Sequence, residues 1–248
     1  MHRQAREGII QAASREFSSK RGAPVSSSPS TTRQEARRLE LIAAGVIVGL
    51  AFFAAIALLL PLVSEYSLTA DYISELAIGR YGYLQTAAFF AVGGSSLALA
   101  VGIRVVTKGS WGSPIGSTFI GLYGLGGILV GRIFPTDEVG AAGRVESPTS
   151  VGTIHIVVSA LAFVFGIAGM FVLSRTFKRD ARWRAFWPWS LVLAVAALVG
   201  FFLQSEVPWV GLSQRIFVGT ITLWLVLVAF RLRSIAKAAS AVQPPRVR

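Results

Sequence analysis

The sequence predicts an all-α fold, a polytopic bundle of about six transmembrane helices. Hydrophobic residues make up 53% of the 248 residues and charged residues only 15%, and the mean hydropathy is +0.62. Apolar segments of about 20 residues, the length that crosses a bilayer as a helix, recur along the chain with short polar breaks between them. Lysine and arginine are concentrated in alternate breaks and in the tails, as is typical of membrane proteins. This pattern leaves no room for a separate globular domain.

Six apolar segments account for most of the chain. Each is long enough to cross the hydrocarbon layer at a rise of about 1.5 Å per residue. Small residues at helix-packing spacing, such as Gly127 and Gly131, favour close approach between neighbouring helices. We expect spanning helices at residues 41–63, 81–104, 114–134, 151–174, 186–204 and 213–232.

The apolar pattern divides the chain into three parts. Residues 1–40 are rich in Ser, Arg, Gln and Ala and contain Pro24 and Pro29, so they bury too little apolar surface to offset the entropy of the chain. We expect them to form a disordered, basic cytoplasmic tail. Residues 41–235 are expected to form the six-helix transmembrane domain, and residues 236–248 a second cytoplasmic tail.

The positive charges predict the orientation in the membrane. Twenty of the 24 Lys and Arg residues lie in the N-terminal tail, in the connections at 104–112 and 175–184, and between residue 231 and the C-terminus. The opposite side holds only Arg80, Arg132, Arg144 and Arg215. Because positively charged loops are retained in the cytoplasm, both termini are expected there. The excess of Arg over Lys indicates a bacterial source, so the membrane is expected to be a bacterial cell membrane.

Tryptophans near the ends of the apolar segments are expected to mark the membrane interfaces. Trp183, Trp187 and Trp189 flank the fifth segment, and Trp209 lies between the fifth and the sixth. Their amphipathic rings favour the headgroup level of a bilayer. We therefore expect all four to act as interfacial anchors.

Composition argues against several functions and cofactors. The net charge of +12 is divided among loops and tails instead of forming one basic face, so nucleic acid is not expected as a partner. The absence of cysteine excludes disulfides, thiolate metal sites and cysteine nucleophiles. Only His155 lies in the membrane domain, since His2 is in the tail, so neither a metal nor another cofactor is expected.

Polar residues on the side with few positive charges form the candidate site. Ionisable groups within or beside an apolar span are costly and usually face the bundle interior with a partner. Arg132 lies near the end of the third segment, His155 about one turn into the fourth, and Arg215 just inside the sixth. The candidate site residues are Ser74, Glu75, Arg132, Asp137, His155 and Arg215.

A short helix is expected in the first connection on this side, at residues 71–77. It would place Ile73 and Leu76 on one apolar face, end at Gly79, and direct Ser74 and Glu75 toward the mouth of the bundle.

Pro135 is expected to end the third helix, because proline cannot continue the hydrogen-bond ladder and biases the preceding residue away from helical angles. The turn would hold Asp137 just outside Arg132. We expect Arg132, Asp137, His155 and Arg215 to converge in one cluster, capped by Ser74 and Glu75, since each buried arginine needs a partner.

Four short motifs resemble those of a bacterial and archaeal family called domain of unknown function 998. The likeness covers about residues 41–235 and implies a six-helix membrane domain with no settled activity or substrate. Members commonly have Glu-Arg where this chain has Gln-Arg. The motifs are Ser74-Glu75-Leu76, Phe134-Pro135-Thr136-Asp137, the lone His155, and Gly211-Leu212-Ser213-Gln214-Arg215.

Three functions remain open for the candidate site, and the biochemical activity is unknown. In a binding or transport role, Arg132 and Arg215 would hold an anionic lipid headgroup or a small solute. A metal-free hydrolase, which we favour less, would use Ser74 as nucleophile, His155 as base and Asp137 as orienting group. In a purely structural role, the cluster would fix the ends of the helices. Membrane lipids are the expected partners, and the oligomeric state is not predicted.

Overall fold

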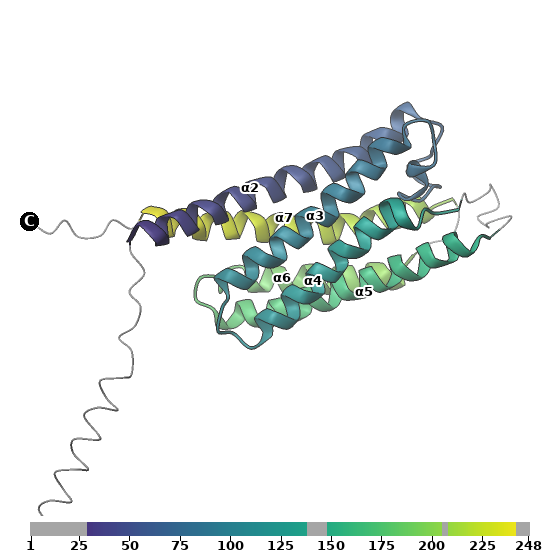
Figure 1. Ribbon diagram of the computed structural model, residues 1–248. Helices are drawn as coiled ribbons and strands as arrows, with labels where there is room; N and C mark the ends of the chain where they lie inside the picture. Colours follow the sequence, from purple (N-terminus) through teal and green to yellow (C-terminus); the bar gives the residue numbers. More distant parts are fainter. Residues whose placement is uncertain (1–28, 138–147, 205–207, 242–248) are drawn as a thin grey trace, which may run out of the picture.

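The computed structural model describes residues 29–137, 148–204 and 208–241. This part of the chain is helical, with no strand, and its six long helices lie side by side (Figure 1). Short single turns extend α2 as η1 (Leu60–Val63), form η2 (Glu75–Ala77), and extend α4 as the π-helical η3 (Leu129–Ile133). The long helices are α2 (Pro29–Leu59), α3 (Gly82–Val106), α4 (Gly112–Ile128), α5 (Ser150–Arg179), α6 (Trp187–Phe202) and α7 (Val210–Ala241).

Five of the helices are long and apolar enough to cross a membrane. The sixth, α6, is apolar but has 16 residues, so it is about 24 Å long and falls short of the roughly 30 Å hydrocarbon layer. Each predicted apolar segment forms one helix, and the prediction of an all-α, polytopic helix bundle is confirmed.

The helices form a closed ring. Each packs against the next in the chain, and α2 packs against α7 to complete the ring. The start of α2 and the end of α7 lie at the same end of the bundle, which we call the terminal end (Figure 1). We call the opposite end the distal end; it carries the connection between α2 and α3, residues 60–81, and the adjoining ends of the other helices.

Helices α2 and α7 continue beyond their apolar segments at the terminal end. Glu40 of α2 lies 3.9 Å from Arg233 and 3.8 Å from Lys237 of α7, and Ala36 and Ala236 are buried beside these pairs. Partly exposed ion pairs contribute at most about 1 kcal/mol each. Small buried side chains together with paired charges therefore extend both helices into the polar region.

These extensions correct the predicted tails. The prediction of disorder is wrong for residues 29–40, which are helical, and residues 236–241 belong to α7. The remaining parts of the predicted tails, 1–28 and 242–248, lie outside the described residues.

Close contact between α3 and α4 depends on glycine. A Cβ atom on Gly93 would lie 2.6 Å from the carbonyl oxygen of Gly124, and one on Gly124 would lie 2.6 Å from that of Gly93. A Cβ atom on Gly131 would lie 2.8 Å from Cβ of Phe89 in α3. The predicted role of small residues in helix packing is thus confirmed for α3 and α4.

The terminal end is tied together by Trp183 and its neighbours. Trp183 is fully buried and stacks on Phe177, with ring centroids 4.2 Å apart and planes 9° apart. The prediction that Trp183 is an interfacial anchor is therefore wrong, because the turn before α6 folds its ring into the core. Trp189 and Trp209 are exposed, as interfacial anchors must be.

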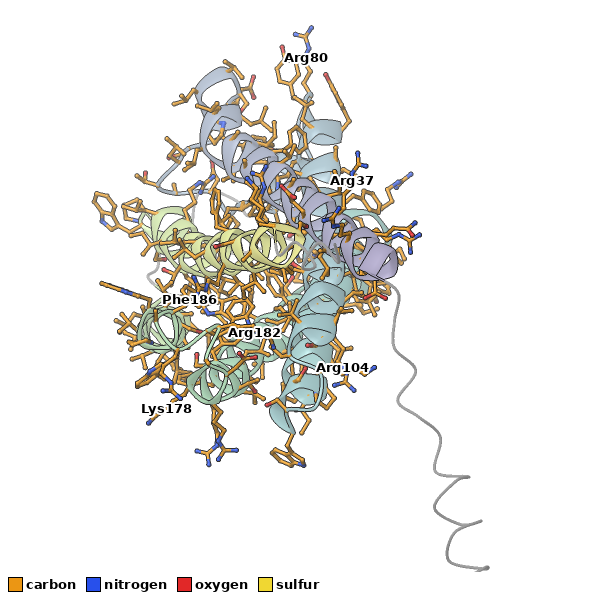
Figure 2. All side chains as sticks on the ribbon, turned by 90° about the vertical axis from the view of Figure 1, so that its left-hand side faces the viewer. Arg37, Arg80, Arg104, Lys178, Arg182 and Phe186 are labelled. Carbon is orange, nitrogen blue, oxygen red and sulfur yellow. The ribbon has the colours of Figure 1, made fainter. Side chains whose placement is uncertain are left out.

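Arg182 holds the connection between α5 and α6 against α3 and α7. Its Nη2 atom donates to the carbonyl oxygen of Val106 at 2.6 Å and pairs with Asp180 at 2.7 Å, and Arg231 of α7 donates to the carbonyl oxygen of Arg182. The hydrogen bonds and charge of Arg182 lower the pKa of Asp180. Figure 2 views the bundle from this end, with Arg104, Lys178 and Arg182 labelled.

Candidate functional site

A cavity of about 450 Å³ lies inside the distal half of the bundle. This volume falls within the range of small-molecule sites in proteins. Aromatic and aliphatic side chains from the helices form its inner part, among them Phe53, Phe89, Val92, Val130, Phe217 and Val218. Polar side chains join the lining near the helix ends, among them Tyr72, Ser74, Asp137, His155 and Gln214.

The connection between α2 and α3 contributes to the lining and is held against the start of α7. The side-chain oxygen of Gln214 accepts a hydrogen bond from the main-chain nitrogen of Ile73 at 2.7 Å. The main-chain nitrogen of Leu212 donates to the carbonyl oxygen of Thr69 at 3.1 Å. These bonds position Tyr72, Ile73 and Ser74 along the cavity.

Arg215 clamps the same connection. It is buried, and its Nη1 atom donates to the carbonyl oxygens of Leu68 at 3.0 Å, Asp71 at 2.7 Å and Gly211 at 3.1 Å. Its Nε atom donates to the carbonyl oxygen of Ala57 in α2 at 3.3 Å. Arg215 therefore joins α2, the connection and α7, and it does not line the cavity.

Gly211 makes this close approach possible. A Cβ atom at this position would lie 2.4 Å from the carbonyl oxygen and 2.9 Å from the nitrogen of Asp71. The main chain of the connection thus occupies the space that any side chain would need.

The predicted helix at residues 71–77 is shorter in the structure. Only the single turn η2 forms, because the carboxylate of Glu75 accepts from the main-chain nitrogen of Tyr72 at 2.6 Å and that of Asp71 accepts from Ser67 at 2.6 Å. Burial, together with the charge of Glu75, raises the pKa of Tyr72. Leu76 is buried, as predicted, and Ser74 lines the cavity, whereas Glu75 is not part of the lining.

His155 is buried in the second turn of α5 and lines the cavity. Its Nδ1 atom lies 2.7 Å from the carbonyl oxygen of Phe134. Because a carbonyl only accepts, Nδ1 carries the proton, and in the neutral ring Nε2 is left with a lone pair. Phe134 is placed for this bond by the π turn that ends the third span before Pro135, where the sequence predicted a helix end.

Asp137 caps the start of α5. Its two oxygens accept from the hydroxyl and the main-chain nitrogen of Thr149 at 2.7 and 2.9 Å, and the Thr149 hydroxyl accepts from the nitrogen of Gly152 at 2.9 Å. A Cβ atom on Gly152 would lie 2.0 Å from the Asp137 carboxylate, so only glycine leaves room for it. The hydrogen bonds from Thr149 lower the pKa of Asp137, so this carboxylate is ionised at neutral pH.

The structure brings three of the six predicted site residues together. Ser74, Asp137 and His155 line the cavity, whereas Arg132 is exposed beside it. Glu75 and Arg215 belong to the connection and its clamp. Main-chain carbonyls, and not carboxylates, hold Arg215 in place, whereas Arg132 is exposed and so is not a buried charge that needs a partner in the core.

The expected Ser74, His155 and Asp137 relay is not assembled as proposed. Phe134 occupies the Nδ1 side of His155, where the orienting carboxylate would have to lie, and Asp137 is engaged by Thr149. What remains is the Nε2 atom of His155 and two cavity-lining serines, Ser74 and Ser159.

Several residues of the site were not found from the sequence, although two carry a recognisable signal. Thr149 stands immediately before an apolar run, as an N-cap residue does. Ser159 follows His155 by four residues and so shares its helix face. Gln214 and Tyr72 carry no such signal. Within the described residues, no group of three or more His, Cys, Asp or Glu side chains lies close enough together to hold a metal ion.

These features define a polytopic helical membrane protein with an internal cavity at one end of its bundle. The family model described as a protein of unknown function (DUF998) matches residues 46–231. Because the match covers most of the chain, the protein belongs to this family. No curated protein and no solved structure matches the chain.

Proposed function

We propose that this protein binds an amphiphilic molecule in the distal cavity, with an uncharged, hydrogen-bonding head near His155 and an apolar chain among the helices. The observation that carries the proposal is the division of the cavity lining into a polar end and an apolar interior. Binding sites of this kind use apolar surface for affinity and a few polar groups for orientation.

The charges around the cavity support an uncharged head. Among the described lining residues, Asp137 is the acidic side chain and His155 the histidine, and no Lys or Arg belongs to the lining. The ionised carboxylate of Asp137 opposes an anionic group at the polar end. The earlier expectation of an anionic headgroup held by Arg132 and Arg215 finds no support in this geometry, since neither arginine reaches the lining.

The tautomer of His155 supports a head that donates hydrogen bonds. With Nδ1 donating to Phe134, the neutral ring offers Nε2 as an acceptor. A ligand hydroxyl can donate to this acceptor, and the hydroxyls of Ser74 and Ser159, which line the same cavity, can donate or accept. A glycerol-like head has the required chemistry.

A binding assay with single-chain lipids tests the proposal. The purified protein in nanodiscs is titrated with radiolabelled 1-palmitoylglycerol and with palmitoyl lysophosphatidic acid, which share the chain and differ in the charge of the head. We expect the uncharged lipid to bind about tenfold tighter or better, a difference of about 1.4 kcal/mol. Gly127→Leu should reduce binding, because Gly127 lines the cavity and tolerates a Cβ atom at ordinary contact distance.

Gly121→Leu is the matched control for this assay. Gly121 lies on the same helix, also accepts a Cβ atom at ordinary contact distance, and is not part of the lining, so binding should be unchanged. Tighter binding of the anionic lipid, lost in Arg132→Ala, would replace our proposal with the anionic site. Absence of saturable binding for both lipids would favour a structural role.

A second candidate function, hydrolysis of such a lipid, is favoured by one observation: His155, with Nε2 not engaged by Phe134, and two serines line the same cavity. The same assay distinguishes it, because 1-palmitoylglycerol contains an ester. Release of palmitate by the wild-type protein, lost in Ser74→Ala with binding retained, would identify an enzyme.

From the distribution of charge we infer that the distal end lies outside the cell, and the cavity therefore in the outer half of the membrane. Because the chain lacks cysteine, a single introduced cysteine is the one thiol in the protein that a reagent can label. With a membrane-impermeant thiol reagent on intact cells, we expect Ala70→Cys and Trp209→Cys to be labelled and Ala181→Cys to be protected. The reverse pattern would invert the orientation.

A further inference from the structure

We propose that the cavity opens sideways into the membrane, between the distal ends of α5 and α7, and that the apolar chain of the ligand enters from the lipid through this opening. The inference rests on the proposed function, because it concerns how the same ligand reaches its site. It also decides the source of the ligand, which would be the membrane and not the aqueous phase.

The opening results from the short length of α6. This helix packs between α5 and α7, yet it ends at Phe202 after 16 residues. Its neighbour α5 has 30 residues and is about 45 Å long, compared with about 24 Å for α6. Because Phe201 meets Phe217, only residues 210–216 of α7 and the first half of α5 continue past the end of α6 toward the distal end, and no helix of the described residues lies between them.

Exposure of the lining residues identifies the side on which the cavity opens. Ile156 and Ala160 of α5 and Gln204, just after α6, line the cavity and are nevertheless exposed. Lining residues of α2 and α3, such as Phe53 and Val92, are buried. The rim of the cavity therefore lies on α5 and at the end of α6.

Three phenylalanines, one from each of α5, α6 and α7, close the edge of this opening that faces the terminal end. The ring centroid of Phe217 lies 4.9 Å from that of Phe163, in an edge-on contact, and 5.7 Å from that of Phe201. All three line the cavity. The three helices are in contact at this level, and the opening extends from here toward the distal end.

The opening lies at the depth of the lipid chains. Ile156 and Ala160 are about 9 and 15 Å along α5 from Ser150, the first residue of a helix that exceeds the roughly 30 Å hydrocarbon layer. Their exposed neighbours Val157 and Leu161 are apolar, as lipid-facing residues are. His155 lies on the distal side of this rim, so a lipid chain can enter while its head stays near the membrane surface.

Exchange kinetics of a bound lipid test the opening. Wild-type protein and the Ala160→Trp and Ile156→Trp variants are placed in nanodiscs, and the uptake and release of radiolabelled 1-palmitoylglycerol are measured together with Kd. A bulky group that narrows the only path slows entry and exit by the same factor, so Kd is unchanged. We expect both rates to fall about tenfold.

Val157→Trp is the matched control, because Val157 is 53% exposed, compared with 61% for Ile156, and does not line the cavity. Its rates should equal those of the wild type. Unchanged rates in Ala160→Trp and Ile156→Trp, or equal slowing in all three variants, would overturn the lateral opening while leaving the bound lipid in place. If Ala160→Trp and Ile156→Trp raise Kd without slowing uptake, the two residues contact the bound lipid and do not border its path, and this result would also overturn the lateral opening. Failure of the wild type to bind would instead remove the proposed function itself.

Discussion

Replacing Arg215 with methionine should lower the stability of the protein more than any other single change to a polar side chain at the distal end. The change removes four hydrogen bonds to main-chain carbonyls and leaves the oxygens of Ala57, Leu68 and Asp71 without this donor. Hydrogen bonds from a charged donor contribute more than neutral ones, although side-chain bonds within membrane bundles average only about 0.6 kcal/mol. Over four bonds we expect a loss on the order of 3 kcal/mol in the free energy of unfolding.

Thermal unfolding of the detergent-purified protein, followed by size-exclusion chromatography after heating, measures this loss as a fall in Tm. Arg132→Met is the matched control, because Arg132 is also an arginine at the distal end but is exposed, and it should change stability by less than about 0.5 kcal/mol. Equal effects of the two substitutions would contradict the clamp. Arg215→Lys should recover only part of the loss, since one ammonium group cannot reproduce the separate Nη1 and Nε contacts.

Replacing Gly93 with alanine should disrupt the close contact between α3 and α4 and lower the stability of the bundle. The new Cβ atom would meet the carbonyl oxygen of Gly124 at 2.6 Å and the main-chain nitrogen of Ile128 at 3.2 Å. The contacting atoms belong to the main chain of α4 and cannot move aside as the end of a flexible side chain can. The two helices α3 and α4 must therefore separate. We expect a loss of about 1–3 kcal/mol, as for overpacked cores.

Gly94→Ala provides an adjacent control for this prediction. Gly94 is exposed on α3, and a Cβ atom there would have no neighbour within 4 Å. Because alanine favours helix over glycine, Gly94→Ala should leave Tm unchanged or raise it, by up to about 1 kcal/mol in stability. A Tm for Gly93→Ala equal to that of Gly94→Ala would show that α3 and α4 are not in close contact.

The separation of α3 and α4 should also reach the cavity. Gly93 and Gly127 both belong to its lining, so a shift between the two helices changes the apolar interior of the site. Arg215 acts on the opposite part, because it holds the connection that carries Tyr72 and Ser74. Helix packing thus shapes the chain-binding interior, and the α7 clamp shapes the polar end.

The membrane architecture was predictable because it depends on the pattern of apolar segments along the chain. A bilayer accepts only long apolar helices, so the length and spacing of the apolar segments determine how many helices form and where they lie in the chain. Pro135 likewise ended its helix where predicted, since the missing N–H group acts through local geometry. The polar continuation of α2 from Pro29 was missed because its stability comes from pairing with α7, far away in the sequence.

The partners of the polar side chains were decided only by the tertiary structure. The sequence by itself determined that Arg215 and His155 lie beside apolar spans and need partners, and that few positive charges share their side of the membrane. It did not determine that Arg215 binds carbonyls of the first connection or that Phe134 accepts from His155, because main-chain oxygens are present at every position and leave no pattern to read. The opening that we propose for the cavity depends on the end of α6 at Phe202 beside the longer helix α5. Its position follows from how six helices pack around one another, which no single segment contains.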